Sequence, residues 1–215
     1  MRPREVPLLS RVPEDVLARH SVTRRYTAGD FVFTQGEPTT GLWVILEGRC
    51  AVERSGPDGH VFTTGVWQPG DIIGIAGLWD GSGYPASARV LDTPTVLLWM
   101  ERSRFLALHR TVPDFAEAVS RALAERLRYV QETVADTRGR PVAAQVATVL
   151  AILARRTGRE IGLTHEDVAH MLGVKRETVT RVLSSFARRG WVVSGYGRIT
   201  VTDPEALAGH AGEVD

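Results

Sequence analysis

The sequence predicts an α+β protein with a β-rich N-terminal half, one long helix, and a helical C-terminal part that ends in a hairpin. Three observations support this prediction: short β-branched and aromatic runs between turn clusters, an apolar repeat at helical spacing after Pro113, and two short amphipathic stretches that meet at Gly173. The 215 residues are 43% hydrophobic and 24% charged, as in folded chains of one large domain or two modest ones.

Short apolar runs alternate with turn residues throughout the first half of the chain. The runs cover residues 31–33, 42–46, 61–66 and 95–99. Glycine-containing turn clusters stand at residues 28–30, 36–38, 56–59 and 69–71. Because this punctuation is too regular for helices, it predicts a small antiparallel barrel or sandwich.

After Pro113 the apolar residues recur at helical spacing. The repeat, at intervals of 4, 4, 4, 3 and 4 residues, comprises Phe115, Val119, Leu123, Leu127, Val130 and Val134. It predicts one long helix with a single apolar seam. Such a seam either covers the chain's own barrel or pairs with a second copy, and its length and charged flanks favour a dimer. Gly139-Arg140-Pro141 predicts a hinge before a second helix over residues 142–156.

From Leu163 the pattern predicts a winged helix-turn-helix. Thr164 and Asp167 form a capping-box pattern at the start of a helix, and Gly173 supplies the turn after it. The inner face of the first helix comprises Val168, Met171 and Leu172, and that of the second comprises Val179, Val182, Leu183 and Phe186. Two β-branched runs at 191–193 and 199–201 then flank a tight hairpin, which is the wing.

Charge is concentrated in this C-terminal part. The whole chain has a net charge of +1 and is no polycation, but residues 173–198 contain six cations and one anion, Glu177. This local excess indicates a polyanionic partner.

The second helix separates into two faces. At about 100° per residue, its apolar positions fall on one arc, and the opposite arc holds Arg176, Glu177, Thr180, Arg181 and Ser184. Arginine can hold guanine O6 and N7, and glutamate can accept from cytosine N4. An acidic residue on a phosphate-seeking surface favours base reading over charge attraction alone. The competing interpretation is an ordinary solvated helix face.

The run from Thr164 to Leu183 resembles the DNA-binding motif of the cyclic AMP receptor protein and FNR family of bacterial transcription regulators. The matching residues are Thr164, Asp167, Ala169, Leu172, Gly173, Val174, Arg176, Glu177, Thr178, Val179, Arg181 and Leu183. The glycine-spaced barrel, long helix and hinge follow the same order, so the resemblance covers nearly the whole chain. It implies a cyclic-nucleotide-binding-like antiparallel β-roll in residues 1–112, a dimerisation helix and hinge in 113–139, and a winged helix-turn-helix in 140–215.

The resemblance also implies roles and partners. Arg176, Glu177 and Arg181 would contact the bases of a TGTGA-like half-site, and a homodimer would bind a pseudo-palindrome on double-stranded DNA with half-sites about one helical turn apart. The remaining predicted DNA contacts are Lys175, Thr178, Thr164 and Thr180. Lys175 departs from the serine that relatives often have there. Arg188, Arg189 and Arg198 are either contacts to the DNA backbone or part of an ordinary solvated face. An activator would also contact RNA polymerase, for which residues 155–159 are candidates.

The ligand cassette departs from the family pattern. In the family's cyclic-nucleotide binders it resembles G-E-L-G-L, a short spacer, then R-S-A, whose glutamate holds the ribose and whose arginine and serine hold the cyclic phosphate. The matching positions here are Gly74, Ile75, Gly77, Ala86, Ser87 and Ala88, with Val130 and Gln131 where relatives have hydroxyls near the purine. Ile75 and Ala86 replace both charged anchors. We therefore predict that cyclic AMP neither binds well nor switches the protein, and that Arg89 points to solvent.

Other cofactors and classes fit less well. The single cysteine, Cys50, cannot hold an iron–sulfur cluster, which takes about four thiolates, and is interpreted as a buried apolar residue. Haem is disfavoured because His20, His60 and His109 have no partners in sequence and are interpreted as surface histidines. No clustered metal ligands or nucleophile motif favours an enzyme. A nucleotide-binding module with no DNA role is disfavoured, because the charged residues that would anchor the nucleotide are missing. What remains is a regulator that needs no ligand, or one switched by an unidentified ligand in the barrel.

The chain has no apolar run near the ~18 residues that span a bilayer, and no apolar signal core follows Met1. We therefore expect a cytoplasmic protein without membrane contact.

Overall fold

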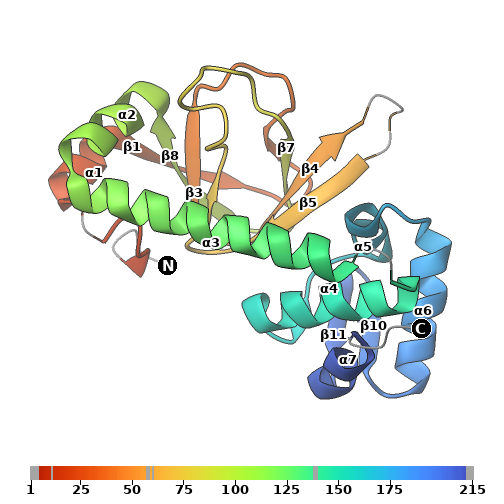
Figure 1. Ribbon diagram of the computed structural model, residues 1–215. Helices are drawn as coiled ribbons and strands as arrows, with labels where there is room; N and C mark the ends of the chain where they lie inside the picture. The colour runs from red at the N-terminus through yellow and green to blue at the C-terminus, as the bar shows by residue number, and fades with distance from the viewer. Residues whose placement is uncertain (1–4, 11, 57–58, 60, 138–139, 212–215) are drawn as a thin grey trace. The chain divides into compact units, whose positions relative to one another are not determined.

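The computed structural model describes residues 5–10, 12–56, 59, 61–137 and 140–211, and the side chains of these except 132–137. The chain divides into two compact units, Met1–Arg126 and Leu127–Asp215 (Figure 1). These units meet within the long helix α3 (Pro113–Thr137). The predicted division into residues 1–112, 113–139 and 140–215 stays a prediction.

The first unit contains two four-stranded antiparallel sheets. Their strand orders are β1-β8-β3-β6 and β2-β7-β4-β5. The elements are α1 (Glu14–His20), β1 (Ser21–Tyr26), β2 (Phe31–Phe33), β3 (Gly41–Glu47), β4 (Cys50–Ser55), β5 (Val61–Trp67), β6 (Ile72–Ile73), β7 (Ser87–Val90), β8 (Thr95–Glu101) and α2 (Arg102–Thr111). The predicted antiparallel β fold is confirmed. The apolar runs correspond to β2, β3, β5 and β8, whereas β1, β4, β6 and β7 were not predicted.

The predicted turn clusters lie between strands, as expected. Each contains a glycine with positive φ, a conformation that residues with a Cβ seldom adopt. These glycines are Gly29, Gly36, Gly59 and Gly70, with φ of 96°, 87°, 79° and 98°.

The main core of this unit lies on one face of the first sheet. Leu98 and Met100 alternate along β8 and are almost fully buried, as are Leu42 and Val44 on β3. Helix α2 contributes Phe105 and Leu108 to the same cluster. Burial of one such side chain stabilises the fold by about 1.5–3 kcal/mol.

The apolar seam of α3 divides into two parts. Phe115 and Val119 are 1% and 0% exposed and join the core of the first unit, and Leu123 packs against that core. Phe115 and Val119 are therefore covered by their own chain and unavailable for a dimer seam, because apolar residues at this spacing can pack on any apolar surface. Leu123 is half-buried, and its place in a dimer seam stays a prediction. Leu127 and Val130 are 59% and 39% exposed in the single chain. The side chain of Val134 lies outside the described residues.

The second unit combines helices with a three-stranded sheet of order β10-β11-β9. Its elements are α4 (Val142–Thr157), β9 (Glu160–Ile161), α5 (His165–Leu172), α6 (Arg176–Arg188), β10 (Val192–Gly195), β11 (Arg198–Val201) and α7 (Pro204–Ala211). The predicted second helix, helix-turn-helix and wing hairpin are confirmed. β9 and α7 were not predicted.

Candidate DNA-binding surface and degenerate ligand cassette

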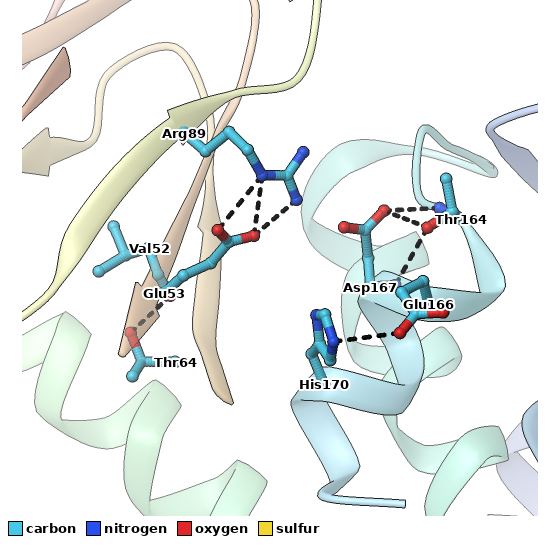
Figure 2. A network of polar contacts seen from close by, with 8 residues as sticks. All are labelled: Val52, Glu53, Thr64, Arg89, Thr164, Glu166, Asp167 and His170. Atoms are coloured by element: carbon cyan, nitrogen blue, oxygen red, sulfur yellow. Dashed lines mark hydrogen bonds and ion pairs between the residues drawn. The ribbon is translucent and has the colours of Figure 1, made fainter. Parts of the chain in front are cut away.

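Helix α5 begins with the capping box that the sequence predicts. The backbone N–H of Asp167 donates to Thr164 Oγ1 at 3.1 Å, and the backbone N–H of Thr164 donates to Asp167 Oδ2 at 2.8 Å (Figure 2). These bonds satisfy donors that a helix start leaves free. At the other end, Gly173 adopts the left-handed conformation with φ 65° and ψ 32°, which turns the chain toward α6.

Helix α6 buries one face and exposes the other. Val179, Leu183 and Phe186 are at most 2% exposed. Val182 on α6, and Met171 and Leu172 on α5, are only half-buried, although the sequence pattern placed them on the inner faces. Lys175, which precedes the helix, makes no side-chain capping bond. The buried face fixes the helix, so the polar face is held in a defined orientation.

The predicted base-contacting trio is solvent-accessible. Arg176, Glu177 and Arg181 are exposed, as is Lys175, whereas Thr178 and Thr180 are half-buried. The structure thus brings the trio together on one accessible face of one helix. Two guanidinium groups and a single carboxylate lie there, and both are side-chain types that can contact base edges.

Two of the predicted contact residues already have neighbours on α5. Arg176 Nε lies 3.8 Å from Glu166 Oε2, and Thr180 Oγ1 lies 3.0 Å from His165 Nδ1. Burial of His165, and then the nearby Arg176 guanidinium, lower the pKa of this imidazole. The contact of His165 with Thr180 therefore links α5 to α6.

Thr164 is committed to the helix cap. Its hydroxyl donates to Asp167 Oδ2 at 2.7 Å while accepting from the Asp167 backbone (Figure 2). A hydroxyl has one proton to donate, and a phosphate only accepts. Thr164 cannot donate to a phosphate while this cap is formed, so its clearest role is to position α5.

The wing adds exposed residues that the sequence patterns did not single out. Tyr196, at the turn between β10 and β11, is fully exposed, and Val193 is 59% exposed. Arg198 Nη1 lies 3.9 Å from Glu160 Oε1, and the Arg189 guanidinium lies 4.8 Å from the centroid of the Trp191 ring. A glycine on each side of Tyr196 was the only available signal for an exposed tip.

Packing favours glycine at both cassette positions, and Gly74 also has a positive φ of 80°. A Cβ on Gly74 would lie 3.1 Å from the Trp43 ring, and one on Gly77 would lie 2.3 Å from Thr39 Oγ1. Tyr84, which the sequence patterns did not single out, stacks on Phe33 with ring centroids 4.2 Å apart and donates to the Gly41 carbonyl at 2.8 Å. These contacts pack the cassette region against β3 and Phe33.

The positions of the two missing anchors are apolar and buried. Ile75 is 5% exposed and belongs to the core cluster, and Ala86 is 8% exposed. The Ser87 hydroxyl accepts from the backbone N–H of Gln35 at 2.9 Å, and Ala88 is fully buried. Val130 and Gln131 are exposed on α3. The cassette therefore has an apolar residue, and no charged group, at each of the two anchor positions.

Arg89 forms an ion pair inside the second sheet. Its Nη2 lies 2.5 Å from Glu53 Oε1, and its Nε donates to both carboxylate oxygens at 3.1 and 3.2 Å (Figure 2). The Arg89 side chain is 27% exposed. The prediction that it points to solvent is therefore wrong, because Glu53, distant in sequence, lies on the adjacent strand β4.

A different arginine links α3 to the region before the cassette. The guanidinium of Arg126 lies 3.9 Å from the centroid of the Trp67 ring, and its Nη1 donates to the Ile72 carbonyl at 2.9 Å. Trp67 is 3% exposed. A cation over a tryptophan face contributes about 0.5–2 kcal/mol, more when it is desolvated.

The residues that the sequence disfavours as cofactor ligands are Cys50, His20, His60 and His109. Cys50 is buried, as predicted, and burial followed by the Asp92 carboxylate raises the pKa of its thiol to about 12. His20 and His109 are half-buried rather than surface residues, and His109 packs against the Trp79 ring. His60 lies outside the described residues.

In the described part of the chain, no three His, Cys, Asp or Glu residues gather as a metal site requires. None of the described helices is both long and apolar enough to span a membrane.

Family models match both halves of the chain. Residues 23–111 match the cyclic nucleotide-binding domain, and residues 144–209 match the Crp-like helix-turn-helix domain. The chain is 31% identical over 194 residues to a CRP-like cAMP-activated global transcriptional regulator of Mycobacterium tuberculosis, covering 86% of each protein. It is also 31% identical over 198 residues to the cyclic AMP receptor protein of Thermus thermophilus, covering 91% of each.

Solved structures show the same fold. A CRP-family transcriptional regulator of Thermus thermophilus aligns with a TM-score of 0.75 at 27% identity, covering 88% of this chain and 97% of that one. FixK2 of Bradyrhizobium japonicum aligns with a TM-score of 0.78 at 20% identity, covering 91% of this chain and 99% of that one. The Mycobacterium tuberculosis relative and the first of these structures are transcriptional regulators, which agrees with the prediction of a regulator rather than an enzyme.

Proposed function

The chain belongs to the CRP/FNR family of transcription regulators, and we propose that it binds a TGTGA-like pseudo-palindrome as a homodimer and activates transcription without needing cyclic AMP. The observation that carries this proposal is the contrast between its two functional regions. Charged base-reading groups are exposed on α6, whereas the charged nucleotide anchors are replaced by buried Ile75 and Ala86.

The exposed face of α6 supports sequence-specific recognition. Arg176 and Arg181 offer bidentate donors for guanine, and Glu177 between them offers an acceptor for cytosine N4. Lys175 and the exposed cations near the wing supply contacts to phosphate that fix orientation but read no sequence. A helix that presents both base-contacting and phosphate-contacting side chains fits the major groove.

The apolar cassette supports independence from cyclic AMP. A cyclic phosphate transferred from water to a buried site needs a charge-assisted partner, and neither Ile75 nor Ala86 can provide one. The Arg126 contacts to Trp67 and Ile72 already tie α3 to the first unit. Both contacts are made by the chain's own residues, and we propose that the DNA-binding form is the unliganded one and that the protein carries no cofactor.

Exposed residues on α3 and around the end of α4 provide candidate surfaces for dimerisation and for contact with RNA polymerase. Leu127 and Val130 are apolar, exposed and one helical turn apart on α3, and so suit pairing with a second copy. RNA polymerase is the proposed partner for activation, with the exposed Arg155 and Arg159 as candidate contacts.

Half-site spacing tests this function. In a labelled duplex with two TGTGA half-sites one turn apart, the protein should bind as two chains per duplex and at least about tenfold more tightly than to a scrambled duplex. Inserting about five base pairs, half a turn, between the half-sites should remove most of that preference. Equal affinity for all three duplexes would contradict sequence-specific binding by a dimer.

A ligand-switched regulator is the second candidate. It is favoured by a cavity of about 1090 Å³ in the first unit, which is large enough for a small molecule. Its lining includes Arg24, Trp43, Tyr84, Trp99, Arg102 and Arg110. A metabolite that changes DNA affinity, and whose effect is lost in the Arg24→Ala variant but not in a variant of the cassette, would favour this candidate.

A further inference from the structure

A second cavity lies inside the DNA-binding unit, between α4 and α7. Its volume is about 500 Å³, within the range of small-molecule sites. Its lining residues come from both helices and their flanks: Arg140, Thr148, Ala151, Ile152, Ala154, Arg155, Arg159, Pro204, Glu205, Ala208 and Ala211. It shares no residue with the exposed trio on α6 or with the ligand cassette.

The mouth of this cavity has an excess of positive charge. Its lining contains three arginines and one carboxylate, that of Glu205. Arg155 and Arg159 are exposed, and among the described residues neither side chain makes an ion pair or a hydrogen bond. Arg140 donates to the Ala211 carbonyl, a contact that closes one end of the cavity. Each guanidinium has five N–H donors in a planar fork, so donors remain free for an anion.

The walls are apolar, with one polar group that lacks a partner. Thr148 is 4% exposed, and no hydrogen bond to its Oγ1 exists among the described residues. Helical threonines commonly donate to the preceding turn, as Thr157 of the same helix does to the Leu153 carbonyl at 3.0 Å. A buried hydroxyl without a partner is unfavourable. The remaining wall consists largely of alanine, isoleucine and proline side chains.

We propose that this cavity binds a small organic acid, with its carboxylate on Arg155 and Arg159 and its apolar body against Ala151 and Ala208. Planar guanidinium donors match a carboxylate, and the alanine-rich wall matches a hydrocarbon or aromatic body. Inorganic phosphate has no apolar body to fill the cavity, and Glu205 opposes highly charged anions. The proposal is independent of the proposed operator and of the loss of cyclic AMP binding.

Calorimetric titration of the full-length protein tests the site directly. The probe is 1-naphthoate, with uncharged 1-naphthamide and inorganic phosphate as controls. We expect 1-naphthoate to bind at one site per chain with a dissociation constant below about 1 mM, and to bind at least about tenfold more tightly than either control. Absence of binding by 1-naphthoate, or equal binding by the amide, would overturn the proposal.

Matched variants locate the bound acid. The Arg155→Ala/Arg159→Ala variant should weaken 1-naphthoate binding by about tenfold or more, whereas Arg25→Ala, which removes an exposed arginine of the other unit, should leave it unchanged. The Ala208→Trp variant should fill the cavity and weaken binding without changing charge. Thermal melts check that each variant folds. If the double variant and Arg25→Ala bind alike, the acid does not bind at this site.

Discussion

The α6 surface and the ligand cassette use the family fold in opposite ways. On α6 the buried face supports an outer face whose charges remain exposed, at Arg176, Glu177 and Arg181. In the cassette the tightly packed glycines remain, but the anchor positions are occupied by buried Ile75 and Ala86. Packing therefore preserves a fold independently of its ligand chemistry, so function must be argued from the side chains at each site.

Among these substitutions, Ile75→Glu should lower the free energy of unfolding most. Although it restores the family's ligand residue by type, it puts a carboxylate into the apolar cluster around Ile75. We expect the free energy of unfolding to fall by about 3 kcal/mol, whereas the control Ile75→Val should lower it by about 1 kcal/mol. Urea denaturation measures both. If the glutamate variant is as stable as the valine variant and binds cyclic AMP, the cassette is not closed by packing.

Arg181→Ala should have its effect on binding, not on stability. Loss of one bidentate base contact should weaken binding to the TGTGA duplex by about 1–3 kcal/mol and relax preference at one base pair, with little change on random duplex. Lys175→Ala is the matched control, because loss of a phosphate contact weakens binding to all sequences and reduces the salt dependence. Fluorescence anisotropy measures both. Equal losses on both duplexes for Arg181→Ala would refute its base-reading role.

His165 makes the DNA-binding unit sensitive to pH. Because its folded-state pKa lies below the ordinary value of 6.5, the folded protein binds fewer protons than the unfolded chain, and its stability falls as pH drops below about 6.5. The His165→Gln variant should lack this part of the pH dependence. Denaturant unfolding of both proteins at several pH values, followed by tryptophan fluorescence, gives the two slopes. Identical slopes would show that His165 does not contribute.

The smallest expected effect concerns Cys50 in the first unit. With its thiol buried and its pKa raised to about 12, very little thiolate is present at about pH 8. A disulfide reagent should leave the native protein unmodified and react with it fully in denaturant. Rapid modification of the native protein would mean that this unit opens readily around β4.

Features that depend on residues close together in the chain could be predicted from the sequence. The capping box at Thr164 and Asp167 and the turn at Gly173 depend on residues near one another in the chain, and the structure contains both. The wing followed from β-branched runs and glycines. By contrast, β1 is a mostly exposed polar strand with little alternation, and it forms by pairing with β8, which is distant in sequence.

Contacts between residues far apart in the chain could not be predicted from the sequence. The Glu53–Arg89 pair forms because β4 and β7 are neighbours in the sheet. The seam of α3 gave the same period for Phe115, which is covered by its own chain, and Leu127, which is exposed. The cavity between α4 and α7 depends on a C-terminal helix that no sequence pattern had indicated.

The most direct test of the contrast between the two regions is one titration of the unmodified protein. The affinity for a labelled TGTGA pseudo-palindrome is measured by fluorescence anisotropy with and without saturating cyclic AMP. We predict tight, sequence-specific binding in both cases, with the two dissociation constants equal to within about twofold. Tightening by about tenfold or more on adding cyclic AMP would contradict the account, because it would mean that the cassette still binds the nucleotide without its charged anchors.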